Sequence, residues 1–196
     1  MRRSSILDDG TNFEQRFMAL EDAAKFAEHA KGLGQKIVAT SGTFDLAHIG
    51  HFSYLEAARA RGDFLIVGVD SDEKVRKSKG PSRPVVAQHE RLHMLAHLRH
   101  VDVLVLKGVD DPPQHFIKNI RPDVLVVSKR NERKEEDIEV LREFCGEVVE
   151  LDSQAVTSTT ARIRKLLLDG VEEYAETAKK EITVVIDRLV KEMRGS

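Results

Sequence analysis

The chain has 196 residues, 33% of them charged, and a formal net charge of −2 at pH 7. This near-balance argues against nucleic acid as the main partner and favours a small-molecule substrate. Cys145 is the single cysteine, so no disulfide can form within the chain, and the first ten residues carry no apolar run. We therefore expect a cytoplasmic protein with no secretory leader and no membrane partner.

The N-terminal part of the chain predicts an arm, a helix and a strand. Residues 1–12 are polar and rich in turn-forming residues, which indicates a flexible arm. Apolar side chains recur at helical spacing over 13–30, and Gly32 and Gly34 then stop the run, so we expect a helix here. The β-branched run at 36–40 follows and predicts the first strand.

Four more strand-like runs follow, each separated from the next by a helix-length segment. They occupy residues 64–69, 101–106, 124–127 and 147–151. Near-continuous apolar strands that alternate with helices are typical of a parallel sheet covered on both faces. We therefore expect one α/β domain over 13–169, a Rossmann-like, doubly wound parallel sheet of about five strands that binds its ligand at the carboxyl ends of the strands.

A C-terminal helical extension is expected over residues 170–196. One stripe of this segment carries apolar side chains at helical spacing. Such a stripe packs more often against its own domain and less often against a second copy of the chain, although the resemblance described below shifts the expectation towards a homodimer. The stripe consists of Tyr174, Ala178, Ile182, Val185, Ile186, Leu189 and Met193.

The segment 41–51 joins the first strand to a helix-like run that begins at Phe52. His48 and His51 stand three residues apart at the expected helix start, so both imidazoles can point at one anion. Gly50 lets a phosphate approach the backbone closely. Two unrelated histidines are the alternative, which the flanking strand, glycine turn and helix disfavour. Gly42, Thr43 and Phe44 are expected to form the floor of the binding pocket, and Ser41 is a further binding candidate.

A second segment rich in hydroxyl groups, 158–164, follows the last expected strand and opens a helix. Ser158 and Thr159 can cap this helix and, with the neighbouring amides, bind an anion. Capping alone would account for one hydroxyl, but not for three in a row followed by two arginines.

Basic residues between these two segments can reach a bound polyphosphate. Lys77 and Lys79 stand beside a Gly-Pro turn, where their side chains can swing over phosphates. Arg91, on the next expected helix, offers a bidentate fork to a phosphate. Solvated surface charge is the alternative for Lys77 and Arg83.

These residues resemble the nucleotidyltransferase superfamily with the G-T-F-D-x-x-H-x-G-H signature. The superfamily includes cytidylyltransferases, pantetheine-phosphate adenylyltransferase and archaeal-type FAD synthetase. Over about residues 19–167 the chain resembles in particular the heptose-1-phosphate adenylyltransferase domain of lipopolysaccharide core biosynthesis. The segments that carry the resemblance are 42–51, 62–63, 69–72, 79–84, 90–91, 101–102, 121–126 and 158–160.

The resemblance implies an enzyme that transfers a nucleoside monophosphate, AMP from ATP, to a sugar phosphate such as heptose 1-phosphate and releases pyrophosphate. Mg²⁺ bound with the nucleoside triphosphate is expected from the chemistry and from the resemblance, because the sequence shows no dedicated cage of carboxylates. His48 and His51 then bind the triphosphate and the reacting phosphorus, and Lys79, supported by Lys77, binds the phosphates. Arg91 binds the acceptor or the β-phosphate. The leaving phosphates are assigned to Ser158 and Thr159.

One segment departs from the heptose enzymes, which carry a glycine pair, an aspartate and an aromatic residue after the strand at 124–127. This chain has Ser-Lys-Arg-Asn at 128–131, so a carboxylate position has become cationic. Base and acceptor therefore stay open, with CMP transfer to glycerol 3-phosphate or a related alcohol phosphate, or AMP transfer to a flavin or pantetheine phosphate, as alternatives. A non-catalytic nucleotide sensor is the alternative from another class. Further substrate-binding candidates are Lys129, Arg130 and Asp45, of which Asp45 is expected to brace the loop.

Two other motif matches are disfavoured. Residues 89–93 match the zinc motif H-E-x-x-H and His97 continues their stripe, but a zinc hydrolase also needs a ligand from a separate element. We expect three histidines on a partly exposed helix face instead. The segment 48–51 also matches class I aminoacyl-tRNA synthetases, whose lysine-rich loop and RNA-binding extension this short, acidic chain cannot supply.

Overall fold

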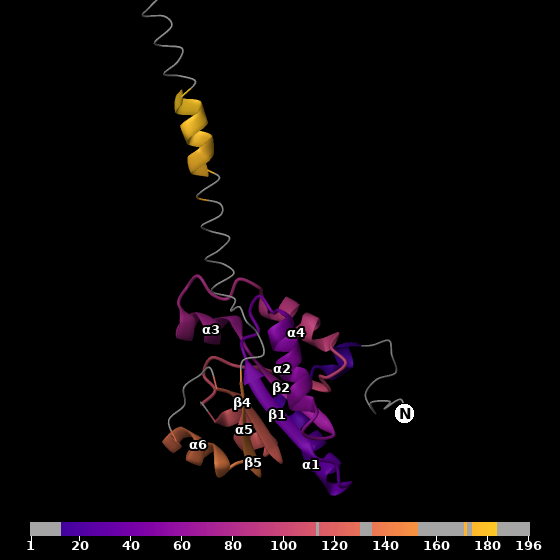
Figure 1. Cartoon of the computed structure of the whole chain (residues 1–196). Coiled ribbons are helices and arrows are strands. Elements are labelled where there is room, and N and C mark those ends of the chain that lie inside the picture. The colour runs from indigo at the N-terminus through magenta and orange to yellow at the C-terminus, as the bar shows by residue number, and fades with distance from the viewer. Residues whose placement is uncertain (1–12, 113, 130–134, 153–170, 172–173, 184–196) are drawn as a thin grey trace, which may run out of the picture. The chain divides into compact units, whose positions relative to one another are not determined.

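The chain divides into two compact units, residues 1–156 and 157–196. The first contains a parallel sheet and the second contains a helix over 174–183 (Figure 1). In the described ranges, no helix combines the length and the apolar character needed to cross a membrane. The structure is a computed structural model that describes residues 13–112, 114–129, 135–152, 171 and 174–183.

The sheet has five parallel strands in the order β3-β2-β1-β4-β5, so the expected α/β fold is confirmed. The strands are β1 (Ile37–Gly42), β2 (Phe64–Asp70), β3 (Val103–Lys107), β4 (Val124–Ser128) and β5 (Glu147–Leu151). The helical segments are the 3-10 turn η1 (Phe13–Arg16), α1 (Leu20–Gly32), α2 (Ile49–Arg59), α3 (Asp72–Lys79), α4 (Gln88–Ala96), α5 (His115–Ile120) and α6 (Glu135–Arg142).

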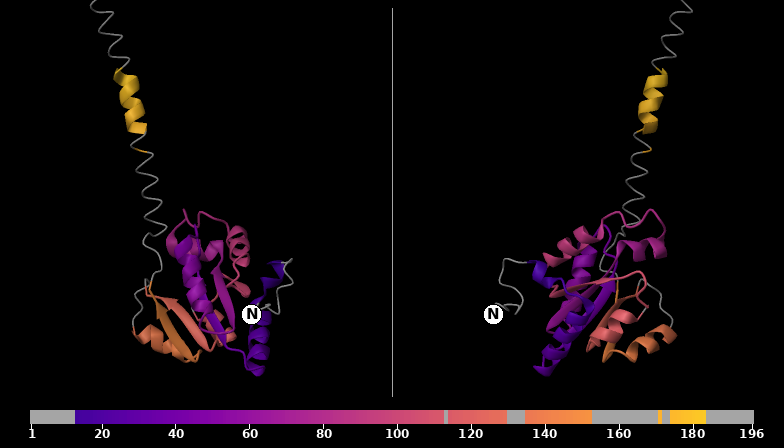
Figure 2. Two further views of the ribbon diagram at one scale, coloured as in Figure 1. Left: turned by 45° about the vertical axis from the view of Figure 1, so that its right-hand side comes forward. Right: turned by 180° about the vertical axis from the view of Figure 1, so that it is seen from behind.

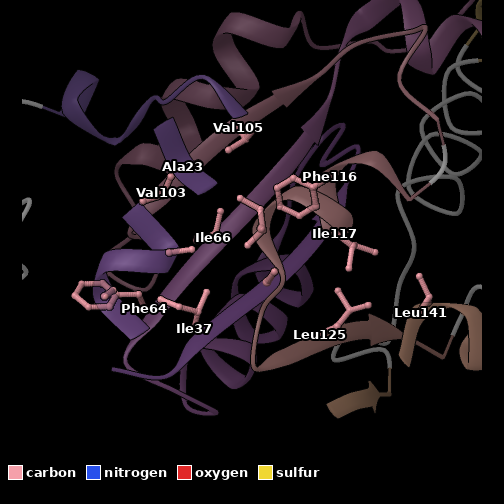
Figure 3. Close-up of a cluster of buried hydrophobic side chains, with 14 of the residues drawn as sticks. Ala23, Ile37, Phe64, Ile66, Val103, Val105, Phe116, Ile117, Leu125 and Leu141 are labelled. Carbon is pink, nitrogen blue, oxygen red and sulfur yellow. The ribbon is translucent and has the colours of Figure 1, made fainter. Parts of the chain in front are cut away.

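Alternate residues of each strand point to opposite faces of the sheet. Both faces carry apolar side chains, and helices cover both. One core lies between the sheet and helices α1, α5 and α6, and it contains Ile37 and Ile66 (Figure 3). The other core lies between the sheet and helices α2 and α4, and it contains Val38 and Leu65. The strands therefore lie between two helical layers, which the two further views also show (Figure 2).

Strand β1 lies at the centre of the sheet, where the strand order reverses. It pairs with β2 on one side, from which the sheet continues to β3, and with β4 on the other, from which it continues to β5. The carboxyl ends of parallel strands share one edge, and the crevice outside such a reversal is where these folds bind ligands. The loop after β1 starts at this edge of the sheet, beside the strand reversal.

The single helix expected over 13–30 is wrong in its first part. Phe17 forms a parallel bridge with β3, and α1 begins only at Leu20. The guanidinium NH1 of Arg16 donates to three backbone carbonyls at the end of α4 and in the loop that follows, over 2.8 to 2.9 Å. This buried attachment ties the segment to another part of the fold, which helical spacing cannot reveal. The expected arm, 1–12, lies outside the described residues.

The helix of the second unit falls within the expected extension 170–196. Its residues are exposed apart from Ala178, which is partly buried, and Tyr174 and Ile182 of the apolar stripe are exposed. The extension's boundary and the homodimer stay predictions. The rest of the stripe lies outside the described residues: Val185, Ile186, Leu189 and Met193.

Candidate active site

The loop after β1 ends in a helix cap built from two histidines. His48 has extended backbone (φ −143°, ψ 174°) directly before α2, and its Nδ1 accepts a hydrogen bond from the Gly50 amide over 3.1 Å. In return, Nδ1 of His51 accepts a hydrogen bond from the His48 amide over 3.3 Å. These reciprocal contacts satisfy backbone amides that a helix start leaves without intrahelical partners.

The cap also fixes the proton position on both rings. A ring nitrogen that accepts a hydrogen bond carries no proton, so neutral His48 and neutral His51 each carry theirs on Nε2. The ring centroids are 4.2 Å apart and the ring planes are inclined by 51°. Two neighbouring N–H donors therefore stand at a helix N-terminus, where the helix dipole also favours an anion.

The turn that leads to the cap uses backbone conformations that side chains rarely adopt. Phe44 (φ 54°) and Leu46 (φ 47°) are both left-handed, at a cost of roughly 1–2 kcal/mol each. The buried Phe44 ring stands edge-on to His51, with centroids 5.9 Å apart. It also lies against Gly42, where a Cβ would come within 3.2 Å of the ring. Gly42 thus makes room for the ring that packs against the histidine cap.

Asp45 holds this turn from the side of the loop at 83–86. Its carboxylate accepts hydrogen bonds from the amides of Val85 and Val86 over 3.0 to 3.1 Å and from Arg83 over 2.8 Å. Burial alone would raise the pKa of Asp45, but the hydrogen bonds from Val86, Val85 and Arg83 outweigh it and lower the pKa. Asp45 is therefore ionised and joins the turn after β1 to the loop at 83–86. These are the contacts expected of a residue that braces the loop.

Arg91 lies inside the protein, and its expected contact with a phosphate is corrected here. Its side chain is fully buried, and its guanidinium donates to the carbonyls of Thr43, Asp70 and Val86 and to the carboxylate of Asp72. A phosphate in solution cannot reach a guanidinium that is enclosed in this way. Arg91 instead joins the loop after β1 to the end of β2 and the start of α3, which makes it a positioning residue.

Lys79 is brought to the site as expected, together with two residues that the sequence did not single out. Its Nζ lies 3.0 Å from Oγ1 of Thr43, next to Asp70, and Asp70 pairs with Lys107. Asp70 and Lys107 are the last residues of β2 and β3. In the sequence, each is a charged residue directly after an expected strand, 64–69 or 101–106. Such a position predicts a side chain at the carboxyl edge of the sheet.

The other expected site residues are dispersed or lie outside the described residues. Ser41 is exposed near the end of β1, and Lys77 is exposed on α3. Lys129 follows β4 and forms a solvent-exposed ion pair with Asp152, with an N···O distance of 3.2 Å. Three candidates fall outside the described ranges: Arg130, Ser158 and Thr159.

The histidines of α4 stand apart from these residues. His89, His93 and His97 are exposed, and the ring of His93 packs edge-on against Phe17 with centroids 5.3 Å apart. They match the expected solvated helix face. Within the part of the chain that the structure describes, no group of three or more His, Cys, Asp or Glu side chains could hold a metal ion.

The chain is similar to known proteins over most of its length. The profile of the cytidylyltransferase-like family matches residues 39–186. Bifunctional protein HldE of Pseudomonas paraeruginosa is 38% identical over 173 residues, which cover 87% of this chain and 35% of that protein. Bifunctional protein HldE of Haemophilus influenzae is 46% identical over 142 residues, which cover 71% of this chain and 29% of that protein. The chain thus spans about a third of the length of these relatives.

A solved structure supports the fold. The lipopolysaccharide core biosynthesis protein from Thermoplasma volcanium superposes with a TM-score of 0.55 at 24% identity, over 61% of this chain and 98% of that chain. The family expected from the histidine signature is confirmed by the profile match and by the relatives. The chain belongs to the cytidylyltransferase-like family of nucleotidyltransferases.

Proposed function

We propose that the chain transfers a nucleoside monophosphate, AMP from ATP, to a sugar phosphate such as heptose 1-phosphate and releases pyrophosphate. The observation that carries the proposal is the histidine cap of α2, which holds two imidazoles with Nε2–H donors next to each other at the carboxyl edge of the sheet. Family membership and the similarity to bifunctional protein HldE support this class of reaction.

The reaction requires no nucleophile from the protein, because the acceptor's phosphate is already an oxyanion at neutral pH. This oxygen forms a bond to the α-phosphorus while the bond to the oxygen bridging towards the β-phosphate breaks, and that electron pair leaves with pyrophosphate. Catalysis therefore depends on alignment and on the stabilisation of negative charge. His48 and His51 supply Nε2–H hydrogen-bond donors, and Lys79 supplies positive charge.

Mg²⁺ with the triphosphate is part of the proposal. This ion keeps several waters and binds through one or two carboxylates together with substrate phosphates. Asp45 and Asp70 already accept hydrogen bonds or ion pairs from protein donors, so neither is set aside for a metal. The substrate's own phosphates would hold the ion, which neutralises phosphate charge when it is bound.

A second candidate is CMP transfer to glycerol 3-phosphate or a related alcohol phosphate. Lys129 is the reason to test it, because this cation follows β4 where the heptose enzymes place a glycine pair and an aspartate, so the choice of base and acceptor stays open. A side chain at the carboxyl edge beside the strand reversal can contact the base or the acceptor.

A pyrophosphate-release screen of the whole chain tests both candidates. ATP and CTP are each combined with heptose 1-phosphate, glycerol 3-phosphate, flavin mononucleotide and phosphopantetheine. We expect release with ATP and the sugar phosphate. Release only with CTP and glycerol 3-phosphate would select the second candidate. Nucleotide binding without release for any pair would indicate a sensor and overturn the proposed reaction.

A homodimer in the cytoplasm is also proposed, from the apolar stripe of residues 170–196 and from the resemblance. Light scattering of the whole chain over a range of concentrations measures the mass of the assembly. A monomer at all concentrations would contradict the dimer, and fractionation of cells tests the location.

A further inference from the structure

Four side chains form one polar chain across the carboxyl ends of β1, β2 and β3. Nζ of Lys107 lies 3.2 Å from Oδ1 of Asp70, and Oγ1 of Thr43 donates to Oδ2 of Asp70 over 3.3 Å. A hydroxyl has one proton, so the oxygen of Thr43 is left to accept from Nζ of Lys79 at 3.0 Å. Asp70 therefore sets the orientation of the hydroxyl group that Lys79 contacts.

The charge of this polar chain depends on Lys107. Asp70 carries one negative charge, and Lys79 and Lys107 carry one positive charge each, so the three groups have a net charge of +1. Without Lys107, Asp70 and Lys79 would balance each other across the Thr43 hydroxyl. An approaching phosphate would then meet a carboxylate whose repulsion is comparable to the attraction of one ammonium at similar distance.

Lys107 is built into the fold. Its side chain is only 13% exposed, and its stem passes over Gly68 in the middle of β2. A Cβ at Gly68 would come within 2.8 Å of Cδ of Lys107 and 3.2 Å of Cβ of Ser41. Gly68 is also the single residue without a side chain in the strand Phe64–Asp70. Because Gly68 has no side chain, the stem of Lys107 can cross β2 at this position and reach Asp70.

We propose that Lys107 is a positioning residue that neutralises Asp70 and thereby leaves the charge of Lys79 available to a substrate phosphate. The carboxylate keeps its second function, which is to orient the Thr43 hydroxyl. The inference rests on the proposed function for the identity of the phosphate, whereas the charge balance can be measured with an anion that needs no turnover.

Titration calorimetry with pyrophosphate as the probe tests the charge balance. In Lys107→Met the carboxylate of Asp70 is uncompensated, so we expect pyrophosphate binding to weaken about tenfold or more at low salt, and less at high salt. Asp70→Asn keeps a hydrogen-bonding side chain but removes the negative charge, and it should bind pyrophosphate at least as tightly as the wild type. Failure of the wild type to bind pyrophosphate would remove the anion site and overturn the inference.

The double variant Asp70→Asn/Lys107→Met separates neutralisation from direct contact. If Lys107 acts through Asp70, the double variant recovers binding to within about threefold of the wild type, because both charges are gone together. If Lys107 binds the phosphate itself, the double variant stays as weak as Lys107→Met, and the inference is wrong. A merely structural lysine would give no recovery either.

Gly68→Ala provides an independent route to the same outcome. The new methyl group collides with the lysine stem, so this variant should weaken pyrophosphate binding as Lys107→Met does and should recover when Asp70→Asn is added. Lys25→Met is the matched control, because Lys25 and Asp22 form an exposed pair on α1 with the same N···O distance of 3.2 Å. It should leave binding unchanged, and thermal unfolding verifies that every variant is folded.

Turnover then distinguishes this inference from the proposed reaction. With an active substrate pair, Lys107→Met should raise the KM of one substrate about tenfold while kcat changes less, and the double variant should restore it. If no pair gives turnover but pyrophosphate binding follows the expected order, the proposed reaction fails and the role of Lys107 stands. If turnover occurs and the double variant does not recover, only the role of Lys107 fails.

Discussion

The charged and ionisable side chains at the two edges of the sheet differ in kind and in their contacts. At the amino edge, Asp63, Asp102 and Asp123 each stand directly before a strand, and each accepts a hydrogen bond from a backbone amide at or beside the start of the neighbouring strand, over 2.7 to 2.9 Å. At the carboxyl edge, imidazoles and ammonium groups surround the loop after β1. At the amino edge the carboxylates satisfy backbone amides of the fold. At the carboxyl edge the imidazoles and ammonium groups are hydrogen-bond donors that an anion can contact.

The difference follows from the direction of the strands. The first residues of a parallel strand leave amides that need acceptors, and a short carboxylate side chain satisfies one within the fold. At the other edge the helix that follows β1 presents its amino end, so donors accumulate there instead. The three aspartates therefore serve stability, and the histidine cap serves binding. Substitutions at the two edges should accordingly separate stability from turnover.

The largest effect is expected at the histidine cap. His51→Ala removes one Nε2–H donor and should lower kcat about 10²- to 10³-fold, as measured by pyrophosphate release. The lost cap contact should reduce the free energy of unfolding by only about 1 kcal/mol. His89→Ala, on the exposed face of α4, is the matched control and should retain full turnover. Unchanged kcat in His51→Ala would remove this imidazole from the reaction.

At the amino edge, Asp102→Ala should affect stability and not catalysis. The variant leaves the Leu65 amide without its acceptor and the largely buried Arg59 without its carboxylate, 2.8 Å away, so the free energy of unfolding should fall by about 3 kcal/mol. Urea unfolding measures the loss, and kcat at a temperature where the variant is folded should change less than twofold. A tenfold lower kcat in folded protein would show that the two edges are not separate.

The expected effect of changing Arg91 on kcat lies between those of His51→Ala and Asp102→Ala. Arg91 is buried like the residues of the amino edge, but it holds the active-site loop in place. Arg91→Lys removes the planar fork that contacts three carbonyls and a carboxylate. We expect kcat to fall about tenfold while the KM of each substrate changes less than threefold, because the loop is displaced and no phosphate contact is lost. A rise in one KM with unchanged kcat would instead indicate direct phosphate binding.

Much of the fold could be predicted from local pattern. The strands were recognised because short apolar runs rich in β-branched residues, four to six residues long, are typical of a sheet, and β5 was placed at its observed bounds. The helix start at His48 was recognised from the glycine turn before it. The break at Phe17 was missed because Arg16 bonds to carbonyls about 80 residues away, and no local period encodes such a contact.

The site was predictable in its main motif but not in its network. His48 and His51 are close in sequence, so their shared position followed from helix geometry. Arg91 was assigned to a phosphate because an arginine's chemistry is visible in a sequence but its burial is not. Lys107 was missed for the same reason, since its path depends on a glycine in another strand, 39 positions before it.

The smallest expected effects concern acid pH, and they have opposite signs at the two edges. Burial raises the pKa of Asp102 above 3.8 despite opposing contributions from the Leu65 amide, Arg59 and Arg16. The folded chain then takes up a proton before the unfolded chain does, so stability falls as the pH rises through this raised pKa. For Asp45, the pKa lies below 3.8, so its contribution is present above 3.8 and is lost as the pH falls through the folded value.

Urea unfolding of the wild type, Asp102→Asn and Asp45→Asn at pH 7, 4 and 3 measures both effects. Between pH 7 and 4 the wild type should gain stability relative to Asp102→Asn, because only the wild type can protonate that buried carboxyl. Between pH 4 and 3 it should lose stability relative to Asp45→Asn, because the unfolded chain takes up a proton at Asp45 before the folded chain does. If the free energy of unfolding changed with pH in the same way for both variants, the carboxylates of Asp102 and Asp45 would lie in equivalent environments. The difference between the amino edge and the carboxyl edge would then not hold for these two groups.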